Sequence, residues 1–368
     1  MKMNFYIPTR MISGKGCVKA EAARLAALGK RCLIVTGASS ARKCGALDDV
    51  TAALESVGVT YSIYDGIRQN PTLESCLEAG AKASAEQADF ILGIGGGSPL
   101  DAAKAIAVVA ANPGIDQAGI YSLKWAHEPL PVVAVGTTAG TGSEVTPVAV
   151  ITTPDGRKKS FRTDSMFPVL ALGDPTYTLS LPDDFTRSTA ADAAAHCLES
   201  YFNRGATDAS MAFAAQGIRS LLPILRKIAA NGTESLTYDD REELYNASIY
   251  AGLAISVTGT AFPHAVGYFL SEQHNVAHGT ACAVFLPAFL RHNSACVPEL
   301  TKKFYTAVGS TEEELIALLV AVTPECHVTI SDTEQEELAP RWVNNSSINK
   351  TWGTVAPEFV REMIAQLA

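Results

Sequence analysis

The feature that most constrains the fold is a change in the pattern of residue types halfway along the chain. The first half alternates short runs rich in β-branched residues with stretches rich in Ala, Glu and Lys, such as residues 21–28 and 73–86. Strands that alternate with helices predict an α/β domain with a parallel sheet, and such sheets bind ligands at the carboxyl ends of their strands. We expect the strands at residues 31–36, 61–64, 90–94, 131–135 and 148–152.

The second half has a different pattern. After Pro182 the chain turns to long stretches rich in Ala and Leu, which predict helices. These stretches are residues 185–203, 210–230 and 241–257. Pro175 and Pro182 would interrupt any helix or strand that continued from the first half into the second. We therefore predict an α/β domain over residues 1–181 and an all-helical domain over residues 182–368.

Composition and charge exclude several classes of protein. The chain has 29 Lys and Arg against 38 Asp and Glu, so it lacks the basic surplus with which proteins bind nucleic acid. No apolar run approaches the roughly 18 residues of a membrane helix, and the start lacks the apolar core of a signal peptide. The eight cysteines are scattered without a CxxC pair, which is typical of reduced core thiols in a cytoplasmic protein.

A glycine-rich turn follows the expected strand at residues 90–94. Three glycines and a serine lie between that strand and an expected helix: Gly95, Gly96, Gly97 and Ser98. Without side chains, their backbone N–H groups can approach a ligand, and the N-terminus of the helix that contains Asp101 favours an anion such as a pyrophosphate. The spacing lacks the third glycine of the usual dinucleotide fingerprint and the Lys of a P-loop. Phosphate binding and a plain tight turn both remain open.

A second loop follows the expected strand at residues 131–135. It carries four hydroxyl side chains: Thr137, Thr138, Thr141 and Ser143. These groups can donate hydrogen bonds to phosphate or ribose oxygens without adding charge, although a Ser/Thr-rich surface loop has the same composition. Because both loops end parallel strands, we expect them to lie close together.

Metal-ligating residue types gather in the helical half. They are Asp192, His196, His264, His274 and His278. Asp192 and His196 are four residues apart, so they stand on one helix face about a turn apart. A carboxylate in so apolar a stretch is costly unless it is paired or binds a metal. A single histidine on an apolar face is more often a core residue, but one carboxylate and three imidazoles together suit Fe²⁺, Zn²⁺ or Mn²⁺.

Together these motifs resemble those of the iron-dependent (group III) alcohol dehydrogenase family, along nearly the whole chain. Four separated motifs agree with the family in order and spacing: Gly95-Gly-Gly-Ser-Pro-Leu-Asp101-Ala-Ala-Lys104, Thr137-Thr-Ala-Gly-Thr-Gly-Ser-Glu-Val-Thr146, Asp192-x3-His196-x2-Glu199 and His264-x13-His278-Gly279. The start of the chain, residues 5–16, also resembles the opening hairpin of the family.

The resemblance implies a dehydroquinate synthase-like architecture, in which a Rossmann-like dinucleotide-binding domain precedes an all-helical metal-binding domain. Nicotinamide and metal are then expected to meet in the cleft. The implied reaction is reversible hydride transfer between a small alcohol or diol and NAD(P)(H), with the metal activating the alcohol or carbonyl oxygen. Fe²⁺ is the expected metal, with Zn²⁺ or Mn²⁺ as alternatives, and a homodimer or higher homo-oligomer is the expected assembly.

The resemblance also assigns residues. The implied metal ligands, which are catalytic, are Asp192, His196, His264 and His278, and Tyr268 is assigned with them as a catalytic residue. The residues assigned to the cofactor are Gly37, Ser39, Ser40, Lys43, Asn70, Gly95, Gly96, Gly97, Ser98, Asp101, Thr137, Thr138, Thr141, Ser143 and Lys158.

The chain departs from the family pattern at three positions. Tyr268 stands where many members carry a histidine four residues after the third metal ligand, so the proton-relay role of that position is open. Gly136 replaces the proline usual before the Thr-Thr motif. His274 is additional, and it lines the cleft or is a solvated or structural histidine.

The loop after the first expected strand bears on the choice of cofactor. Members that prefer NAD commonly carry an Asp there for the ribose 2′-hydroxyl, whereas this chain has Gly37. Hydroxyl and cationic groups that would accept a 2′-phosphate follow: Ser39, Ser40 and Lys43. We therefore predict NADP(H) in preference to NAD(H).

Rival functions remain within and outside this superfamily. A zinc glycerol dehydrogenase and a maleylacetate-type reductase would share the fold. A dehydroquinate synthase-like lyase would need a pocket rich in Lys and Arg, and residues 183–290 are poor in them. A catalytically silent protein that binds metal or nucleotide is the alternative from a different class, and turnover distinguishes it from the enzymes.

Overall fold

The computed structural model describes residues 3–343, 345–365 and 367, which group into two compact units. The α/β unit is Ile7–Leu181. The helical unit runs from Pro182 to the C-terminal end and includes residues 3–6, where the ring of Phe5 lies 5.2 Å from that of Phe213. The segment before Ile7 therefore groups with the helical unit, whereas the predicted α/β domain began at residue 1.

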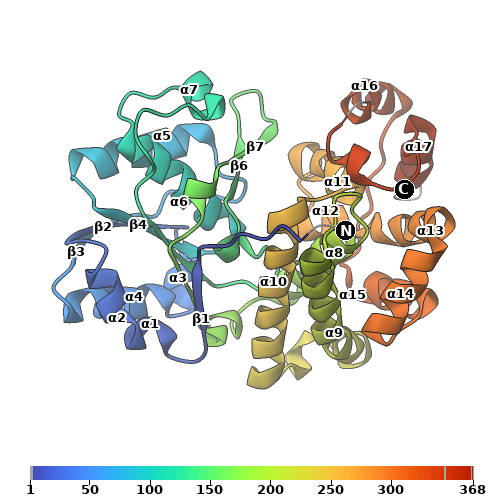
Figure 1. Cartoon of the computed structure of the whole chain (residues 1–368), viewed down its shortest axis with the longest axis horizontal. Helices are drawn as coiled ribbons and strands as arrows, with labels where there is room; N and C mark the ends of the chain where they lie inside the picture. The colour runs from blue at the N-terminus through green and yellow to red at the C-terminus, as the bar shows by residue number, and fades with distance from the viewer. Residues whose placement is uncertain (1–2, 344, 366, 368) are drawn as a thin grey trace. The chain divides into compact units, whose positions relative to one another are not determined.

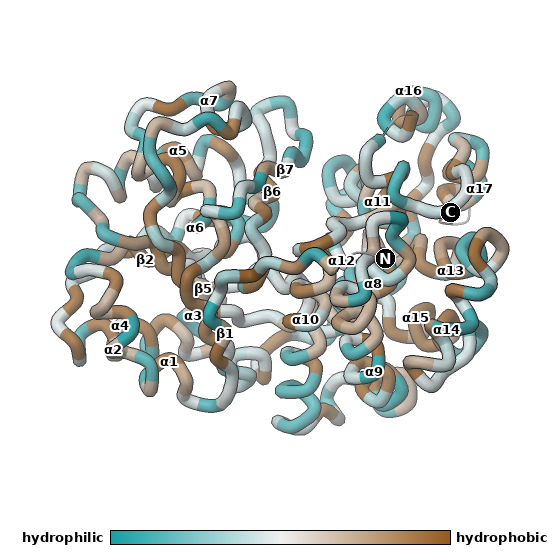
Figure 2. The backbone as a smooth tube through the Cα atoms, in the orientation of Figure 1, coloured by the Kyte–Doolittle hydropathy of each residue, from teal (hydrophilic) through white to brown (hydrophobic). Residues whose placement is uncertain are grey.

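The α/β unit is built on a six-stranded sheet in which every neighbouring pair is parallel (Figure 1). The strand order is β1-β8-β5-β4-β2-β3. The bounds are β1 Arg10–Ser13, β2 Arg31–Thr36, β3 Thr60–Tyr64, β4 Phe90–Gly95, β5 Val132–Gly136 and β8 Leu170–Gly173. Four of the predicted strands are found within one residue of their predicted bounds. Figure 2 shows the hydrophobic residues along β2 and β5.

Helices cover both faces of this sheet because side chains alternate along each strand. Leu33 and Val35 of β2 join one core with α5 and α6, whereas Cys32 and Ile34 join another with α1, α2 and α4. The bounds are α1 Cys17–Ala20, α2 Ala22–Ala26, α3 Ser40–Lys43, α4 Ala46–Ser56, α5 Leu73–Ala85, α6 Gly97–Ala111 and α7 Gln117–Ser122. Both surfaces of the central strands are thus buried, which leaves the strand ends for ligands.

Two expectations about strands are wrong. The strand β6 Val148–Thr152 lies outside the parallel sheet and pairs antiparallel with β7 Lys158–Arg162, because the turn at Gly156, with φ of 78°, returns the chain directly. Residues 5–16 form no hairpin either, since β1 pairs parallel with β8, its neighbour in the sheet. Alternation of residue types predicts a strand but does not identify its partner.

The helical unit contains the longer helices. Their bounds are α8 Asp183–Tyr201, α9 Asp208–Asn231, α10 Tyr238–Thr258, α11 Phe262–Gln273, α12 His278–Ala283, α13 Leu286–Cys296, α14 Pro298–Val308, α15 Glu312–Val322, α16 Asp332–Trp342 and α17 Pro357–Ala365. In α8 every residue from 190 to 201 is buried, because α9, α10 and α12 all pack against this helix. Its small Ala side chains permit that close approach.

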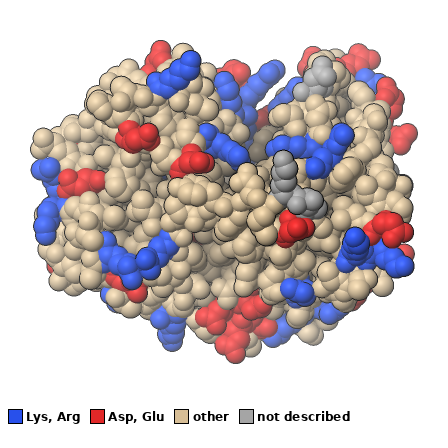
Figure 3. Space-filling view, in the orientation of Figure 1, with Lys and Arg blue, Asp and Glu red and all other residues tan. Residues whose placement is uncertain are grey.

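Among the described residues no single helix is long and apolar enough to cross a membrane. The helices α10 and α11 pass that test only together, across a bend of 108°, as core helices also do. On the face drawn in Figure 3, Lys and Arg side chains are dispersed among acidic and uncharged ones.

Candidate active site

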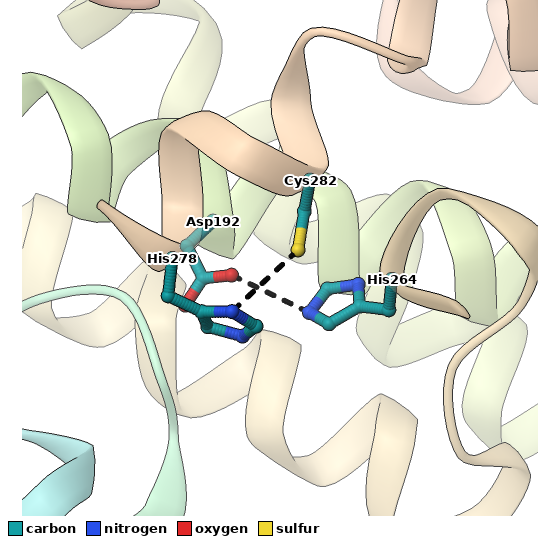
Figure 4. Close-up of side chains that lie close together, drawn as sticks. All are labelled: Asp192, His264, His278 and Cys282. Carbon is teal, nitrogen blue, oxygen red and sulfur yellow. Dashed lines mark hydrogen bonds and ion pairs between the residues drawn. The ribbon is translucent and has the colours of Figure 1, made fainter. Parts of the chain in front are cut away.

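Side chains from three helices of the helical unit converge on one point. Asp192 and His196 lie one turn apart on α8, His264 lies on α11, and His278 begins α12. Asp192 Oδ1 is 3.5 Å from His264 Nε2 and 3.8 Å from His196 Nε2. Asp192, His264, His278 and Cys282 each have a ligand-type atom within 4.8 Å of those of the others, and Figure 4 shows them pointing toward one another.

This donor set fits a divalent cation. Asp192 Oδ1 and His264 Nε2 are both buried, and neither has a hydrogen-bond partner among the described residues. Buried polar atoms without partners are costly, so a ligand that satisfies both would stabilise the site. Carboxylate oxygen and imidazole nitrogen are ordinary ligands of Fe²⁺, Zn²⁺ and Mn²⁺.

His196 lies beside this group of four rather than within it. Its ring stacks on that of His264 with centroids 4.7 Å apart, and its Nε2 approaches Asp192. The structure therefore groups three of the predicted ligands, Asp192, His264 and His278, and places His196 against the first two.

A fully buried glutamate, Glu199, orients one of the histidines. Glu199 Oε1 is 2.5 Å from His264 Nδ1, and Glu199 Oε2 accepts a hydrogen bond of 2.6 Å from the N–H of Ala261. A carboxylate only accepts, so His264 Nδ1 carries a proton, and Nε2 is the nitrogen of this ring that faces Asp192. Glu199 belongs to the family motif that begins at Asp192 and lies seven residues later on the same helix face, but no role was predicted for it.

The electrostatics of the cluster favour a cation. Burial by itself raises the pKa of Asp192, but His196, His264 and His278 outweigh burial and hold that pKa well below its usual range. Burial lowers the pKa of His264, yet Cys282 and Glu199 raise it to a value well above the ordinary one. Asp192 therefore stays ionised, and a metal ion would bind the cluster by displacing the protons of the histidines.

Tyr268 and His274 occupy different positions relative to this cluster. Tyr268 is half-buried one turn after His264, and its ring centroid lies 5.7 Å from that of His278. His274 faces away toward Glu334, with 2.6 Å between Nε2 and Oε1. His274 also lines a cavity of about 690 Å³ within the helical unit. Of the two, only Tyr268 lies against the candidate ligands.

In the α/β unit, the glycine turn joins β4 to α6 and requires glycine. Gly95 has φ of 153°, and a Cβ there would lie 2.5 Å from Pro99 Cγ. A Cβ on Gly96 would lie 2.8 Å from Thr138 Oγ1, and one on Gly97 would lie 3.0 Å from Thr141 Cγ2. The two predicted loops are thus in contact, as expected for loops that follow adjacent parallel strands.

Two further predicted cofactor residues lie near this turn. The backbone N–H of Asn70 donates to Ser98 Oγ at 3.3 Å. Thr152 Oγ1 donates to the carbonyl oxygen of Asn70 at 3.3 Å, and Thr152 pairs with Lys158 in the β6–β7 hairpin. Asn70, Ser98 and the end of the hairpin that carries Lys158 are therefore linked.

A buried hydrogen-bond chain uses two of the other predicted residues. Lys104 Nζ donates to Ser143 Oγ at 2.7 Å, and Ser143 Oγ donates to Asp101 Oδ1 at 2.6 Å. Burial lowers the pKa of Lys104 and raises that of Asp101. These hydrogen bonds hold the second loop against α6. No role was predicted for Lys104 from the sequence. Binding of the cofactor by Asp101 and Ser143 stays a prediction.

The loop after β2 lies at the same edge of the sheet, because Thr36 pairs with Ile94 at the ends of β2 and β4. Gly37 is half-buried, and a Cβ there would lie 3.2 Å from the carbonyl oxygen of Ile67. The side chains that follow are exposed: Ser39, Ser40 and Lys43. The structure therefore leaves these three groups accessible to a ligand.

A parallel sheet with a glycine turn at the carboxyl end of a central strand, and a helical unit with a histidine and aspartate cluster, are features that suit a metal-dependent enzyme with a nucleotide cofactor. Comparison with known families is specific. The family model for iron-containing alcohol dehydrogenase matches residues 8–175, and the C-terminal model of the Fe-containing alcohol dehydrogenase family matches residues 186–328. The chain belongs to the iron-containing alcohol dehydrogenase family.

Individual relatives agree with this membership. The chain is 33% identical over 305 residues to a 1,3-propanediol dehydrogenase of Klebsiella pneumoniae, covering 80% of this chain and 76% of the relative. It is 32% identical over 300 residues to a lactaldehyde reductase of Escherichia coli K12, covering 80% and 77%. A crystal structure of an iron-containing alcohol dehydrogenase matches with a TM-score of 0.92 at 33% identity, covering 100% and 99% of the two chains.

Family membership settles the general activity. The protein is an oxidoreductase that interconverts alcohols and aldehydes with a divalent metal and a nicotinamide cofactor. The predicted family, enzyme class and fold class are confirmed.

Proposed function

We propose that this chain transfers hydride reversibly between a short neutral alcohol or diol and NADP(H), at a metal held by Asp192, His196, His264 and His278. The observation that carries the proposal is the pair of buried atoms without partners, Asp192 Oδ1 and His264 Nε2, in a cluster of ligand-type side chains. Relatives named as a 1,3-propanediol dehydrogenase and a lactaldehyde reductase support a short substrate.

The helical unit would bind the oxygen atom of the alcohol or aldehyde that reacts. When bound, a divalent cation supplies Lewis acidity toward an alcohol or carbonyl oxygen. Glu199 keeps His264 in the tautomer that presents Nε2, and Asp192 supplies the negative charge that the histidines lack. Tyr268, whose ring centroid lies 5.7 Å from that of His278, would orient the substrate or exchange a proton through its phenol group.

The α/β unit binds the cofactor mainly through backbone. The N–H groups of the turn from Gly95 to Ser98, at the N-terminus of α6, would bind the diphosphate, with the hydroxyl groups of Thr137, Thr138 and Thr141 assisting. Cofactor choice depends on the loop after β2, where Gly37 presents no carboxylate and Ser39, Ser40 and Lys43 are exposed. A relative from Bacillus methanolicus is named as an NAD-dependent methanol dehydrogenase. The preference for NADP(H) is therefore argued from the loop of this chain and not from its relatives.

Location and assembly complete the proposal. The described structure contains eight free cysteines, which favours a reducing compartment, and we place the enzyme in the cytoplasm. A homodimer or higher homo-oligomer rests on the family resemblance alone, and sedimentation of the purified protein tests it.

The test is a turnover assay on protein purified without oxygen. The enzyme is loaded with Fe²⁺, Zn²⁺ or Mn²⁺ and supplied with NADPH or NADH and a panel of short aldehydes, with dihydroxyacetone and maleylacetate added for the rival activities. We expect oxidation of NADPH that depends on both metal and aldehyde. Absence of turnover with every metal and substrate would favour a catalytically silent binding protein.

A further inference from the structure

A cysteine occupies the metal centre together with the predicted ligands. Cys282 lies on α12 four residues after His278, so the two side chains share a helix face, as Asp192 and His196 do on α8. Cys282 is fully buried, and its Sγ is 3.8 Å from His278 Nδ1. In Figure 4 its sulfur points to the same centre as Asp192 and His264. Geometry therefore groups Cys282 with the ligands rather than with the hydrophobic core.

Another buried cysteine shows that burial alone does not produce this arrangement. Cys197 follows His196 on α8 and is also fully buried. Its Sγ faces α9, where a Cβ on Gly217 would lie 2.4 Å from it, and Cys197 is not part of the ligand cluster. Cys197 has the environment expected of a core thiol, and Cys282 does not.

We propose that Cys282 Sγ is an additional metal donor of this centre. Asp192, His264 and His278 are then common to two donor sets, one completed by the imidazole of His196 and the other by the sulfur of Cys282. The inference rests on the proposed metal site and extends it. On binding, the S–H bond breaks, a sulfur–metal bond forms and the proton passes to solvent, so no oxidant or reductant is needed.

The spacing of the donor atoms supports this assignment. Four tetrahedral ligands at about 2.0–2.3 Å from one ion lie roughly 3.3–3.8 Å apart. The four donor atoms of Asp192, His264, His278 and Cys282 lie within 4.8 Å of one another, so side-chain shifts of at most about 1 Å would close them around one ion. A thiolate is a soft ligand that favours Zn²⁺ more strongly than Mn²⁺. The cysteine therefore widens the range of metals that the centre can hold and favours Zn²⁺.

Cobalt loading tests the proposal directly, because a thiolate bound to Co²⁺ gives a charge-transfer absorption in the near ultraviolet. The full-length protein is freed of metal, titrated with Co²⁺, and compared with Cys282→Ser, Cys282→Ala and the matched control Cys197→Ser. We expect the absorption in the wild type and in Cys197→Ser, and its loss in both Cys282 variants, which still bind Co²⁺ through the other ligands.

Metal selectivity provides a second readout. In Cys282→Ser the affinity for Zn²⁺ should fall by about tenfold, while the affinity for Mn²⁺ changes little. A wild-type cobalt complex without the absorption, or the same absorption in the Cys282 variants, would overturn the inference and leave the proposed metal centre intact. A wild type that binds neither Co²⁺ nor Zn²⁺ would overturn both.

Discussion

The two units build their sites in opposite ways. In the α/β unit the cofactor turn depends on missing side chains, since Gly95 and Gly96 leave no room for a Cβ. In the helical unit the centre depends on side chains that are present, and Asp192 and His264 keep unpartnered buried atoms aimed at each other. A site made of backbone is damaged by adding atoms, whereas a site made of side chains is damaged by removing them.

The largest effect is expected from removing a ligand. His264→Ala should abolish metal binding and metal-dependent turnover, because Nε2 of this residue is a buried atom without a hydrogen-bond partner in the proposed metal site, on a ring held by Glu199. The matched control is His292→Ala, a half-buried histidine of the same unit whose Nε2 bonds the carbonyl oxygen of Trp352. Metal content and turnover are measured for both variants. Full metal content in His264→Ala would remove the residue from the centre.

In the α/β unit, removing one buried charged side chain, that of Lys104, should also be strongly damaging. Lys104→Met should lower the free energy of unfolding by about 3–5 kcal/mol, because Asp101 would lose its buried cationic partner. The control Lys82→Met, which breaks an exposed pair with Glu86, should cost at most about 1 kcal/mol. Urea unfolding measures both. Equal losses in the two variants would show that the Lys104 chain does not stabilise the unit.

Adding atoms should damage the cofactor turn. Gly96→Val should raise the Kd for NADPH by about 10- to 100-fold, the loss expected when hydrogen bonds to a charged group are broken. Because a Cβ there also meets Thr138, the variants Gly96→Ala, Thr138→Ala and their combination are compared by fluorescence titration. If Thr138→Ala fully restored binding to Gly96→Ala, the clash between the two loops would account for the whole effect.

Changing Glu199, the hydrogen-bond partner of His264, should lower metal affinity less than removing His264 does. Glu199→Gln should lower metal affinity by about 10- to 100-fold, the usual result of changing a residue that orients a metal-bound histidine. Affinity for NADPH should stay unchanged, because Glu199 belongs to the helical unit. Calorimetric titration with Zn²⁺ measures the first and fluorescence the second. An unaltered metal affinity would mean that Glu199 does not orient His264.

The loop after β2 should affect the choice of cofactor rather than turnover itself. The wild type should prefer NADPH over NADH in kcat/KM by about 10- to 100-fold, and Gly37→Asp should reverse the preference through charge repulsion. Gly37→Asn is the control, because it adds nearly the same volume beside Ile67 without the charge. A wild type that prefers NADH would show that this loop does not select the 2′-phosphate.

The parts that could be predicted from the sequence are those set by local pattern. The run of β-branched residues in β2 predicted that strand, and the spacing of Asp192 and His196 predicted two donors on one helix face. The strand β8, Leu170–Gly173, was missed because its four residues carry no β-branched side chain.

What could not be predicted depends on tertiary contacts. The hydrogen bond from His264 to Glu199 joins residues 65 apart in sequence, and the bond from Lys104 to Ser143 joins residues 39 apart. Cys282 could have been noticed from its spacing to His278, but the same spacing occurs in helices without metal. Only the packing of α12 on α8 distinguishes a histidine and a cysteine that share a metal site from the same pair in an ordinary helix.

The most direct test of the account is the effect of metal removal on the wild-type enzyme. Aldehyde-dependent oxidation of NADPH is measured before chelation, after complete removal of metal, and after Fe²⁺ is restored, and the Kd for NADPH is measured in each state. We expect turnover to be lost and then recovered while the Kd stays constant, because the residues proposed for the metal and for the cofactor belong to different units. Undiminished turnover in protein shown to be free of metal would contradict it.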